Sequence, residues 1–307
     1  MRCDRCEEEA MTFIRYSGAH LCAEHLSVFV ETRVKREVRR QLRLEGSTRV
    51  ACALSGGKDS SVATHLLHAI LGRRPDVELV AVTVDEGIAG YRPPSLERAQ
   101  ALCRTLDLEH HILTYRDLVG WEMDEVVAAD TETIPCSFCG VFRRKALNVL
   151  ARQVEADYLA TGLNLDDTTQ TVLMNLGRAD LEKLARMGPH DHVQPGLVPR
   201  VQPLRTVPEK EVYLYAFLEE IPFHDGSCPY AERGLRNRYR EVLLDLERDS
   251  PGTRHALLSS FEELKGLLRE RHPPASLSAC ARCGEPTMAR LCQSCRFVEH
   301  LAALMPA

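Results

Sequence analysis

Short spacings between cysteines are the clearest chemical feature of this 307-residue sequence, which contains twelve cysteines. One group reads C-x2-C-x15-C-x2-H and another reads C-x2-C-x8-C-x2-C, so each supplies four thiolate or imidazole ligands on two turns. Four such ligands suit a tetrahedral zinc ion, which would also replace the hydrophobic core that so short a segment cannot build. We therefore predict two structural zinc sites, one formed by Cys3, Cys6, Cys22 and His25 and the other by Cys280, Cys283, Cys292 and Cys295.

Five cysteines remain outside these two groups. Cys52 lies in an apolar segment typical of a buried strand, and Cys103 lies in a segment with helical apolar spacing. Both are expected to pack in the core as small hydrophobic residues. Cys136 and Cys139 form another C-x2-C pair, which by spacing alone fits half a zinc site or a redox pair, and Cys228 stands apart from them.

A glycine loop stands between a predicted strand at residues 49–54 and a predicted helix with the apolar spacing of SVATHLLHAIL. Its glycines let backbone N–H groups close on an anion, the helix N-terminus adds partial positive charge, and Lys58 can neutralise a further phosphate oxygen. Because the lysine follows the glycines directly, the loop differs from the G-x-x-x-x-G-K-[ST] motif of P-loop NTPases. We predict a phosphate-binding loop formed by Ser55, Gly56, Gly57, Lys58, Asp59 and Ser60.

Two further predicted strands end in polar residues. The strand at 78–84 is followed by Asp85, and the strand at 156–161 is followed by Gly162 and then by Asp166 and Asp167. Strands that alternate with helices predict a parallel sheet, and ligands of such sheets bind beyond the carboxyl ends of the strands. The three aspartates are candidates for magnesium binding or general acid–base chemistry, although each could instead cap a helix. Asp167 is preferred to Asp166, for which a helix cap is an equal alternative.

Length and charge set the class of protein. The length predicts one catalytic domain plus smaller modules, and the absence of a signal sequence and of a run of about 18 apolar residues predicts a soluble cytoplasmic protein without membrane contact. Because the net charge is −5, any contact with nucleic acid must come from local basic patches, and residues 33–43 and 234–240 are candidates for such patches. The first could equally be a solvated helix face relieved by Glu31. Residues 178–208 predict a long flexible connection, and Thr206 and Glu209 predict a capping box.

Together these motifs resemble those of the tRNA 2-thiouridine synthetases of the TtuA type and their archaeal and eukaryotic cytosolic relatives. The resemblance runs nearly end to end, through SGGKDS of the PP-loop ATP pyrophosphatases, VDEGIAGYR, GWEMDEVV, CSFCGVFRR, ATGLNLDDTTQTVLMNL, DGSCPY and both terminal cysteine modules. It implies an α/β fold, with a Rossmann-like PP-loop domain that has a parallel sheet and two flanking zinc-binding modules. The expected boundaries are a zinc finger at 1–30, the catalytic domain with its iron–sulfur site at 31–275 and a zinc ribbon at 276–307.

The resemblance also assigns a second metal group and the catalytic residues. Cys136, Cys139 and Cys228 would hold a [4Fe-4S] cluster, in which one iron without a protein ligand is open to a hydrosulfide. ATP with Mg²⁺ would adenylate a uracil C2 oxygen, and sulfur would then displace AMP. The implied catalytic residues are Lys58, Asp59, Asp167 and Arg143, and Asp85 and Gly162 would join Ser55 to Ser60 in binding ATP. Two positions depart from the family: Leu163 replaces a histidine, and Arg143 stands where some relatives have lysine, which favours charge stabilisation over proton transfer.

The implied activity is 2-thiolation of tRNA, at wobble uridine 34 in preference to uridine 54. The implied partners are tRNA, a sulfur donor that is either a ubiquitin-like thiocarboxylate carrier or free sulfide, and a second copy of the chain in a homodimer. Two alternatives remain. Another PP-loop adenylating ligase would leave the three cysteines unexplained, and a non-catalytic zinc-ribbon RNA-binding adaptor would leave SGGKDS unexplained.

Overall fold

The computed structural model of the chain describes residues 1–190, 193–231 and 236–304. At its centre lies a five-stranded parallel sheet with the strand order β5-β4-β3-β6-β7. The strands are β3 (Thr48–Ala53), β4 (Val77–Asp85), β5 (Glu109–Thr114), β6 (Tyr158–Ala160) and β7 (Arg200–Val201). The chain runs outward from β3 to β5 and then returns to β6 on the other side of β3. The strand order therefore reverses beside β3, which is where ligands bind in doubly wound sheets.

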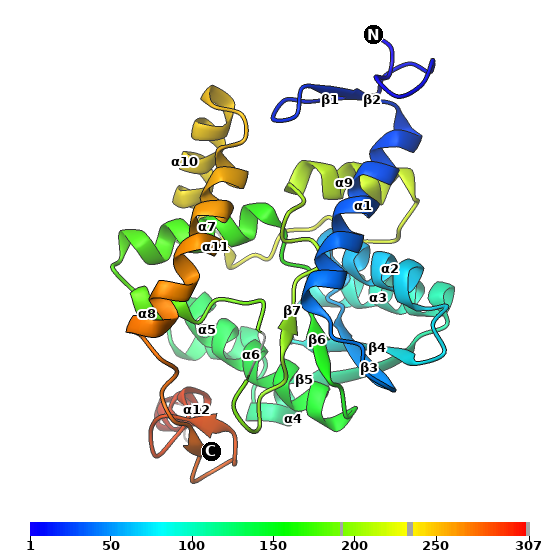
Figure 1. Ribbon diagram of the computed structural model, residues 1–307. Helices are drawn as coiled ribbons and strands as arrows, with labels where there is room; N and C mark the ends of the chain where they lie inside the picture. Colours follow the sequence, from blue (N-terminus) through cyan, green and yellow to red (C-terminus); the bar gives the residue numbers. More distant parts are fainter. Residues whose placement is uncertain (191–192, 232–235, 305–307) are drawn as a thin grey trace.

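Helices cover both faces of this sheet (Figure 1). One face carries α1 (Ala23–Gln41), α2 (Lys58–Leu71), α3 (Arg92–Leu106) and α9 (Glu209–Leu218), and the other carries α4 (Tyr115–Val119), α5 (Met123–Ala129) and α6 (Pro135–Gln153). Successive side chains of a strand point to opposite faces. Accordingly Val50 and Cys52 pack with the first layer of helices, and Ala51 packs with the second.

A lobe of four helices stands beside the sheet. It consists of α7 (Leu165–Gly177), α8 (Leu181–Ala185), α10 (Arg236–Asp249) and α11 (Thr253–Arg271). Leu165 and Val172 of α7, Leu184 of α8, and Leu258 and Phe261 of α11 form its small core. Because α7 begins just beyond β6, this lobe borders the carboxyl end of the sheet.

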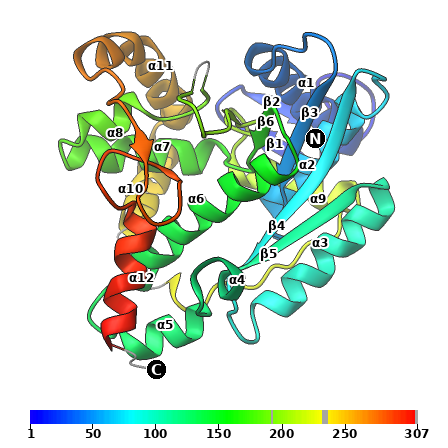
Figure 2. The ribbon, with the colours of Figure 1, turned by 90° about the horizontal axis from the view of Figure 1, so that it is seen from below.

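The two cysteine modules lie at opposite ends of the molecule (Figure 1). The N-terminal module contains the hairpin of β1 (Thr12–Ile14) and β2 (Ala19–Leu21) and leads directly into α1. The C-terminal module contains β8 (Ser278–Ala279), β9 (Pro286–Thr287) and α12 (Gln293–Leu304), which packs against α6 and α5 (Figure 2). Across the described residues, every helix is too short or too polar to span a bilayer.

Several local predictions can be compared with this fold. Cys52 and Cys103 are 1% and 4% exposed, which confirms that both are core residues. The connection predicted at 178–208 is largely irregular in its described residues, but it also contains α8 and β7, which the prediction missed. A two-residue strand held by pairing with β6 has no detectable period of its own. The predicted capping box is also wrong, since α9 begins at Glu209 and its N-cap is Pro208, whose side chain makes no capping hydrogen bond.

Candidate active site

The glycine loop connects β3 to α2 at the carboxyl end of the sheet, as predicted. Gly56 has φ +84°, and a Cβ there would collide with the backbone carbonyl of Ser95, so only glycine fits. Ser60 donates its hydroxyl to the carbonyl of Gly57 at 2.9 Å and accepts from the N–H of Ser55 at 3.1 Å. These bonds hold the loop in a tight curve at the N-terminus of α2, where backbone dipoles favour an anion.

Gly162 brings the end of β6 against the same loop. A Cβ at Gly162 would lie 2.7 Å from the backbone carbonyl carbon of Asp59 and 2.7 Å from the backbone nitrogen of Ser60. The absence of a side chain therefore allows the first turn of α2 to pack against the β6–α7 connection. This places the carboxyl ends of β3 and β6 side by side, as their strand pairing requires.

Lys58 lies in the first turn of α2 between two carboxylates. Its Nζ lies 2.9 Å from an oxygen of Asp59 and 2.8 Å from an oxygen of Glu209 in α9. Burial alone would lower the pKa of Lys58, but Asp59 and Glu209 outweigh it and raise the pKa above its usual value. The side chain is therefore a fixed cation beside the loop. Sequence reasoning missed Glu209, which it interpreted only as part of a helix cap.

The start of α7 brings Asp167 towards Asp59. Asn164 is the N-cap of α7, accepts from the N–H of Asp167 at 3.0 Å and donates its side-chain amide to Asp59 at 2.9 Å. Burial raises the pKa of Asp167 to about 6, with further contributions from Asp59 and Glu209 and an opposing one from Arg236. These carboxylates line a cavity of about 130 Å³. Oxygen ligands in this arrangement suit a hard divalent cation such as Mg²⁺.

Asp166 borders the same cavity, whereas Asp85 does not. Asp166 forms an ion pair with Arg254 and accepts from the backbone N–H of Glu209 at 2.8 Å. It therefore joins α7 to α11 and bonds the first N–H of α9, as a helix-capping carboxylate does, which supports the capping alternative. Asp85 ends β4, and its carboxylate accepts from the N–H of Gly87 at 2.9 Å. It lies outside the cavity that contains Asp59 and Asp167.

Several basic residues in the two segments predicted to bind RNA are paired with carboxylates in the structure. In α1, Arg33 is paired with the buried Glu211 at 2.6 Å and Lys35 with Glu31 at 2.9 Å, so these two cations are already neutralised. Residues 234 and 235 of the second segment lie outside the described residues. Arg236 pairs with Asp167 at 3.2 Å and Arg240 with Glu209 at 2.8 Å, which places both arginines at the cavity.

The remaining cysteines come from two segments near the carboxyl end of the sheet. Cys136 and Cys139 are the second and fifth residues of α6, so both lie near its N-terminus. Burial raises the pKa of the Cys139 thiol, although Arg143 opposes this effect. Cys228 lies beyond α9 and packs in the same apolar cluster as Cys139. Burial raises the pKa of the Cys228 thiol, and the negative charge of Cys136 raises it further. All three thiols therefore belong to one local environment.

Cys139 and Cys136 differ in their contacts. Cys139 accepts from a guanidinium N–H of Arg143 at 3.1 Å, and its sulfur lies 3.5 Å from the hydroxyl of Tyr115. Cys136 is exposed, with its sulfur 3.9 Å from the carbonyl oxygen of Tyr230. Among the described residues, these three thiols do not lie as close together as the ligands of the two four-residue groups, and Cys136 is exposed. By its chemistry, a set of three thiols suits a [4Fe-4S] cluster that keeps one iron without a protein ligand.

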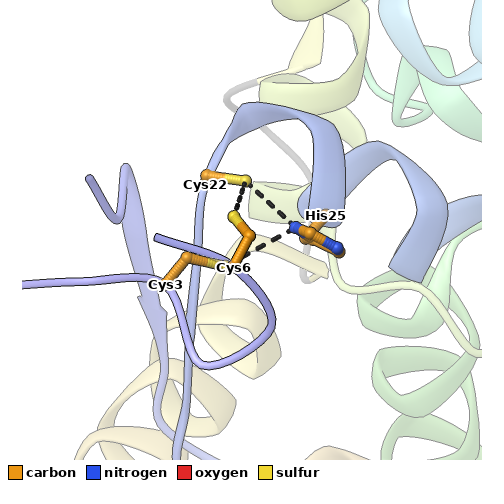
Figure 3. Close-up of side chains that lie close together, drawn as sticks. All are labelled: Cys3, Cys6, Cys22 and His25. Carbon is orange, nitrogen blue, oxygen red and sulfur yellow. Dashed lines mark hydrogen bonds between the residues drawn. The ribbon is translucent and has the colours of Figure 1, made fainter. Parts of the chain in front are cut away.

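The two four-residue groups are assembled as their spacing predicts. Within each group, one ligand atom per residue lies within 4.8 Å of the others: Cys3, Cys6, Cys22 and His25 in one, and Cys280, Cys283, Cys292 and Cys295 in the other. Figure 3 shows the first group, with the sulfurs of Cys6 and Cys22 3.7 Å apart. Tetrahedral zinc with Zn–S bonds of about 2.3 Å places its sulfurs roughly 3.8 Å apart. Both groups could therefore hold zinc.

Two protein-family models match the segments of the chain that contain these residues. Residues 30–247 match the model of the PP-loop domain, and residues 2–27 match that of the N-terminal LIM domain of the 2-thiouridine synthetase TtuA. Together these matches cover the nucleotide loop, the three cysteines near it and the first four-residue group.

Individual relatives match over almost the whole chain. The tRNA 2-thiolation protein NcsA of Haloferax volcanii is 41% identical over 99% of this chain and 100% of its own. The cytoplasmic tRNA 2-thiolation protein 1 of Anopheles gambiae is 33% identical over 94% of this chain and 85% of its own. Among solved structures, the U34-tRNA thiolase NcsA from Methanococcus maripaludis with its [4Fe-4S] cluster is 33% identical, covers 99% of both chains and has a TM-score of 0.85.

Proposed function

Since the chain belongs to the TtuA/NcsA family of tRNA 2-thiolation proteins, we propose that it is an ATP-dependent tRNA-uridine 2-sulfurtransferase. We further propose wobble uridine 34 as its target, because the similar Methanococcus maripaludis protein is named a U34-tRNA thiolase. Thiolation of uridine 54 is the alternative within the family. A PP-loop ligase and a non-catalytic RNA-binding adaptor are the alternatives outside it.

The observation that carries the proposal is a connection between the nucleotide loop and the third cysteine. His224 donates its backbone N–H to the carbonyl of Gly56 at 2.8 Å, and Cys228 follows on the same segment. The loop, which suits ATP phosphates, is thus hydrogen-bonded to the segment that carries one of the three thiols suited to sulfur chemistry. A ligase would not need the thiols, and an adaptor would not need the loop.

The proposed reaction begins with adenylation. The uracil C2 oxygen attacks the α-phosphorus of ATP and pyrophosphate leaves; a sulfur nucleophile then forms the C–S bond at C2, and AMP leaves with the former uracil oxygen. Lys58 and the backbone N–H groups of the loop would stabilise the charge that builds on the phosphates. Asp59 and Asp167 would hold Mg²⁺, and Asp85 and Gly162, at neighbouring strand ends, would complete the ATP site.

Cys136, Cys139 and Cys228 would hold the [4Fe-4S] cluster. When bound, a cluster with three protein ligands supplies an iron position open to a hydrosulfide. Arg143 stays protonated, so its N–H bond to the sulfur of Cys139 stabilises negative charge there, and Arg143 does not transfer a proton. Tyr115 donates its hydroxyl to the backbone carbonyl of Cys139 at 2.8 Å, which holds the N-terminal part of α6 against α4.

The proposed surroundings follow from the same family. We propose a cytoplasmic protein that acts on tRNA as a homodimer, with a zinc ion at each four-residue group. The sulfur donor is proposed to be a ubiquitin-like thiocarboxylate carrier or free sulfide. The name of the Anopheles gambiae relative, a cytoplasmic tRNA 2-thiolation protein, supports the compartment and the substrate.

Mass spectrometry of digested tRNA tests the proposal. Protein reconstituted anaerobically with iron and sulfide is incubated with ATP, Mg²⁺, sulfide and tRNA transcripts that carry cytidine at position 34 or at position 54. We expect 2-thiouridine in the unchanged transcript and in the position-54 variant, and none in the position-34 variant. Pyrophosphate release without thiolation would instead identify a ligase, and neither product would identify an adaptor.

A further inference from the structure

Glu86 is a buried carboxylate between two arginines that come from different helices. It follows Asp85 at the end of β4 and is 4% exposed. One carboxylate oxygen accepts from Nε of Arg143 at 3.0 Å, and the other lies 3.1 Å from Nε of Arg92. The second contact is an ion pair without hydrogen-bond alignment. A single buried negative charge thus orients two guanidinium groups.

On one side of Glu86, Arg92 is hydrogen-bonded to the nucleotide loop. Its guanidinium is buried and donates to the backbone carbonyl of Ser55 at 2.8 Å and to the carbonyl of Val84. Arg92 also donates to the hydroxyl of Ser95, whose backbone lies against Gly56. Arg92 therefore fixes the first residue of the loop relative to the end of β4.

On the other side of Glu86, Arg143 is hydrogen-bonded to a cysteine. Its NH2 group donates to the sulfur of Cys139 at 3.1 Å, and its side chain is 49% exposed. A half-exposed arginine has many accessible rotamers, so a fixed partner is needed to keep its guanidinium on one sulfur atom. Glu86 is such a partner, because it is buried and held in turn by Arg92.

We propose that Glu86 is a positioning residue that holds Arg143 against the sulfur of Cys139 and, through Arg92, fixes this contact relative to Ser55 of the nucleotide loop. The inference deepens the proposed function and rests on it. It assigns a role to Glu86 and Arg92, two residues within VDEGIAGYR that sequence reasoning left without one. Partners that orient the ligands of a metal site commonly change its affinity by about 10- to 100-fold when they are removed.

The stability of the cluster tests this role without an activity assay. Wild-type protein and the Glu86→Gln variant are reconstituted anaerobically, and the loss of visible absorption is followed after addition of a ferrous iron chelator. We expect loss roughly 10-fold faster in Glu86→Gln. The control is Glu78→Gln, which removes a carboxylate from the same strand that is paired with Arg49 at 2.7 Å on the surface; its rate should equal that of the wild type.

Two further variants separate positioning from a merely structural role. Glu86→Asp keeps a buried carboxylate between the two arginines but shortens the side chain, which takes the carboxylate out of hydrogen-bond distance of Arg143. The variant should fold normally, as judged by circular dichroism, and still lose the cluster faster than the wild type. If Glu86 acts through Arg143, the double variant Glu86→Gln/Arg143→Gln should lose the cluster no faster than Arg143→Gln alone.

The outcomes distinguish the inference from the function on which it rests. Equal rates for the wild type and both Glu86 variants, or effects of Glu86→Gln and Arg143→Gln that multiply in the double variant, would overturn the positioning role alone. A wild-type protein that takes up no cluster would overturn the proposed function and this role with it.

Discussion

Lys58 and Glu209 are joined by an ion pair of 2.8 Å although 151 residues separate them in the chain. Each lies in the first turn of its helix, so the pair connects the start of α2 to the start of α9 at the edge of the cavity. Asp59 and Glu209 keep Lys58 protonated despite its burial, so the lysine is a cation beside the loop whose charge these two carboxylates balance. That charge would neutralise phosphate oxygens of ATP.

Replacing Lys58 by methionine should therefore remove adenylation while the fold is retained. Loss of one pre-organised charge at developing negative charge commonly costs about 100- to 1,000-fold in rate. We expect a loss of this size in tRNA-dependent pyrophosphate release by Lys58→Met. Lys183→Met is the matched control, since Lys183 is 68% exposed and is paired with Asp180. Pyrophosphate release by Lys58→Met at the control rate would exclude a catalytic role for the lysine.

Asp167→Asn should lower activity and raise stability in a pH-dependent way. The folded-state pKa of Asp167 is about 6, above its ordinary value of 3.8, so the folded protein binds this proton more tightly than the unfolded chain does. The stability that the proton contributes is complete below pH 3.8 and is lost as the pH rises through about 6. Asparagine has no carboxyl proton to lose, so the Asp167→Asn variant avoids this loss of stability. Thermal unfolding should show a higher midpoint for Asp167→Asn at pH 7.5 and a smaller difference at pH 5, and a constant difference would argue against the raised pKa.

The two four-residue groups should bind zinc independently, because they lie at opposite ends of the molecule (Figure 1). Elemental analysis of the wild type should give two zinc ions per chain, and Cys22→Ser and Cys292→Ser should each retain one. Each loss should also lower the unfolding midpoint, since the metal contributes folding free energy to segments that have little core. Full zinc content in either variant would show that its group is not the ligand set.

The C-terminal module should support the helix that carries two of the three cysteines proposed to hold the cluster. Phe297 of α12 packs with its ring 4.5 Å from that of Phe138, a fully buried residue between Cys136 and Cys139. Phe297→Ala is expected to cost about 2 kcal/mol in unfolding free energy, less than a fully buried phenylalanine would, and to accelerate loss of the cluster absorption. Leu304→Ala, at an exposed position of the same helix, is the control. Cluster loss at equal rates in both variants would contradict this coupling.

The parts of the site that the sequence predicts are those with a local pattern. The SGGKDS loop, the cysteine spacings and the strand ends before Asp85 and Gly162 are each contiguous, so residue type and spacing alone indicate their positions. The parallel α/β fold and the two assembled cysteine groups confirm this reasoning.

The residues that sequence reasoning missed depend on distant partners. Glu86 lies 57 residues from Arg143, and Glu209 lies 151 residues from Lys58, so nothing in the local sequence distinguishes either glutamate from a surface residue. Arg236 and Arg240 carried a basic pattern that suggested RNA, but the fold pairs them with Asp167 and Glu209. Strand β7 escaped notice because its two residues are ordered by pairing with β6 and not by their own sequence.

The visible absorption of anaerobically purified protein tests the central claim, that Cys136, Cys139 and Cys228 together hold a [4Fe-4S] cluster. An iron–sulfur cluster absorbs broadly in the visible range, whereas zinc is silent. We predict the band in the wild type and in Cys103→Ala, which removes a core cysteine, and its loss in Cys228→Ser with the zinc content unchanged. A band of wild-type intensity in Cys228→Ser, or a colourless wild type that thiolates tRNA, would contradict the account.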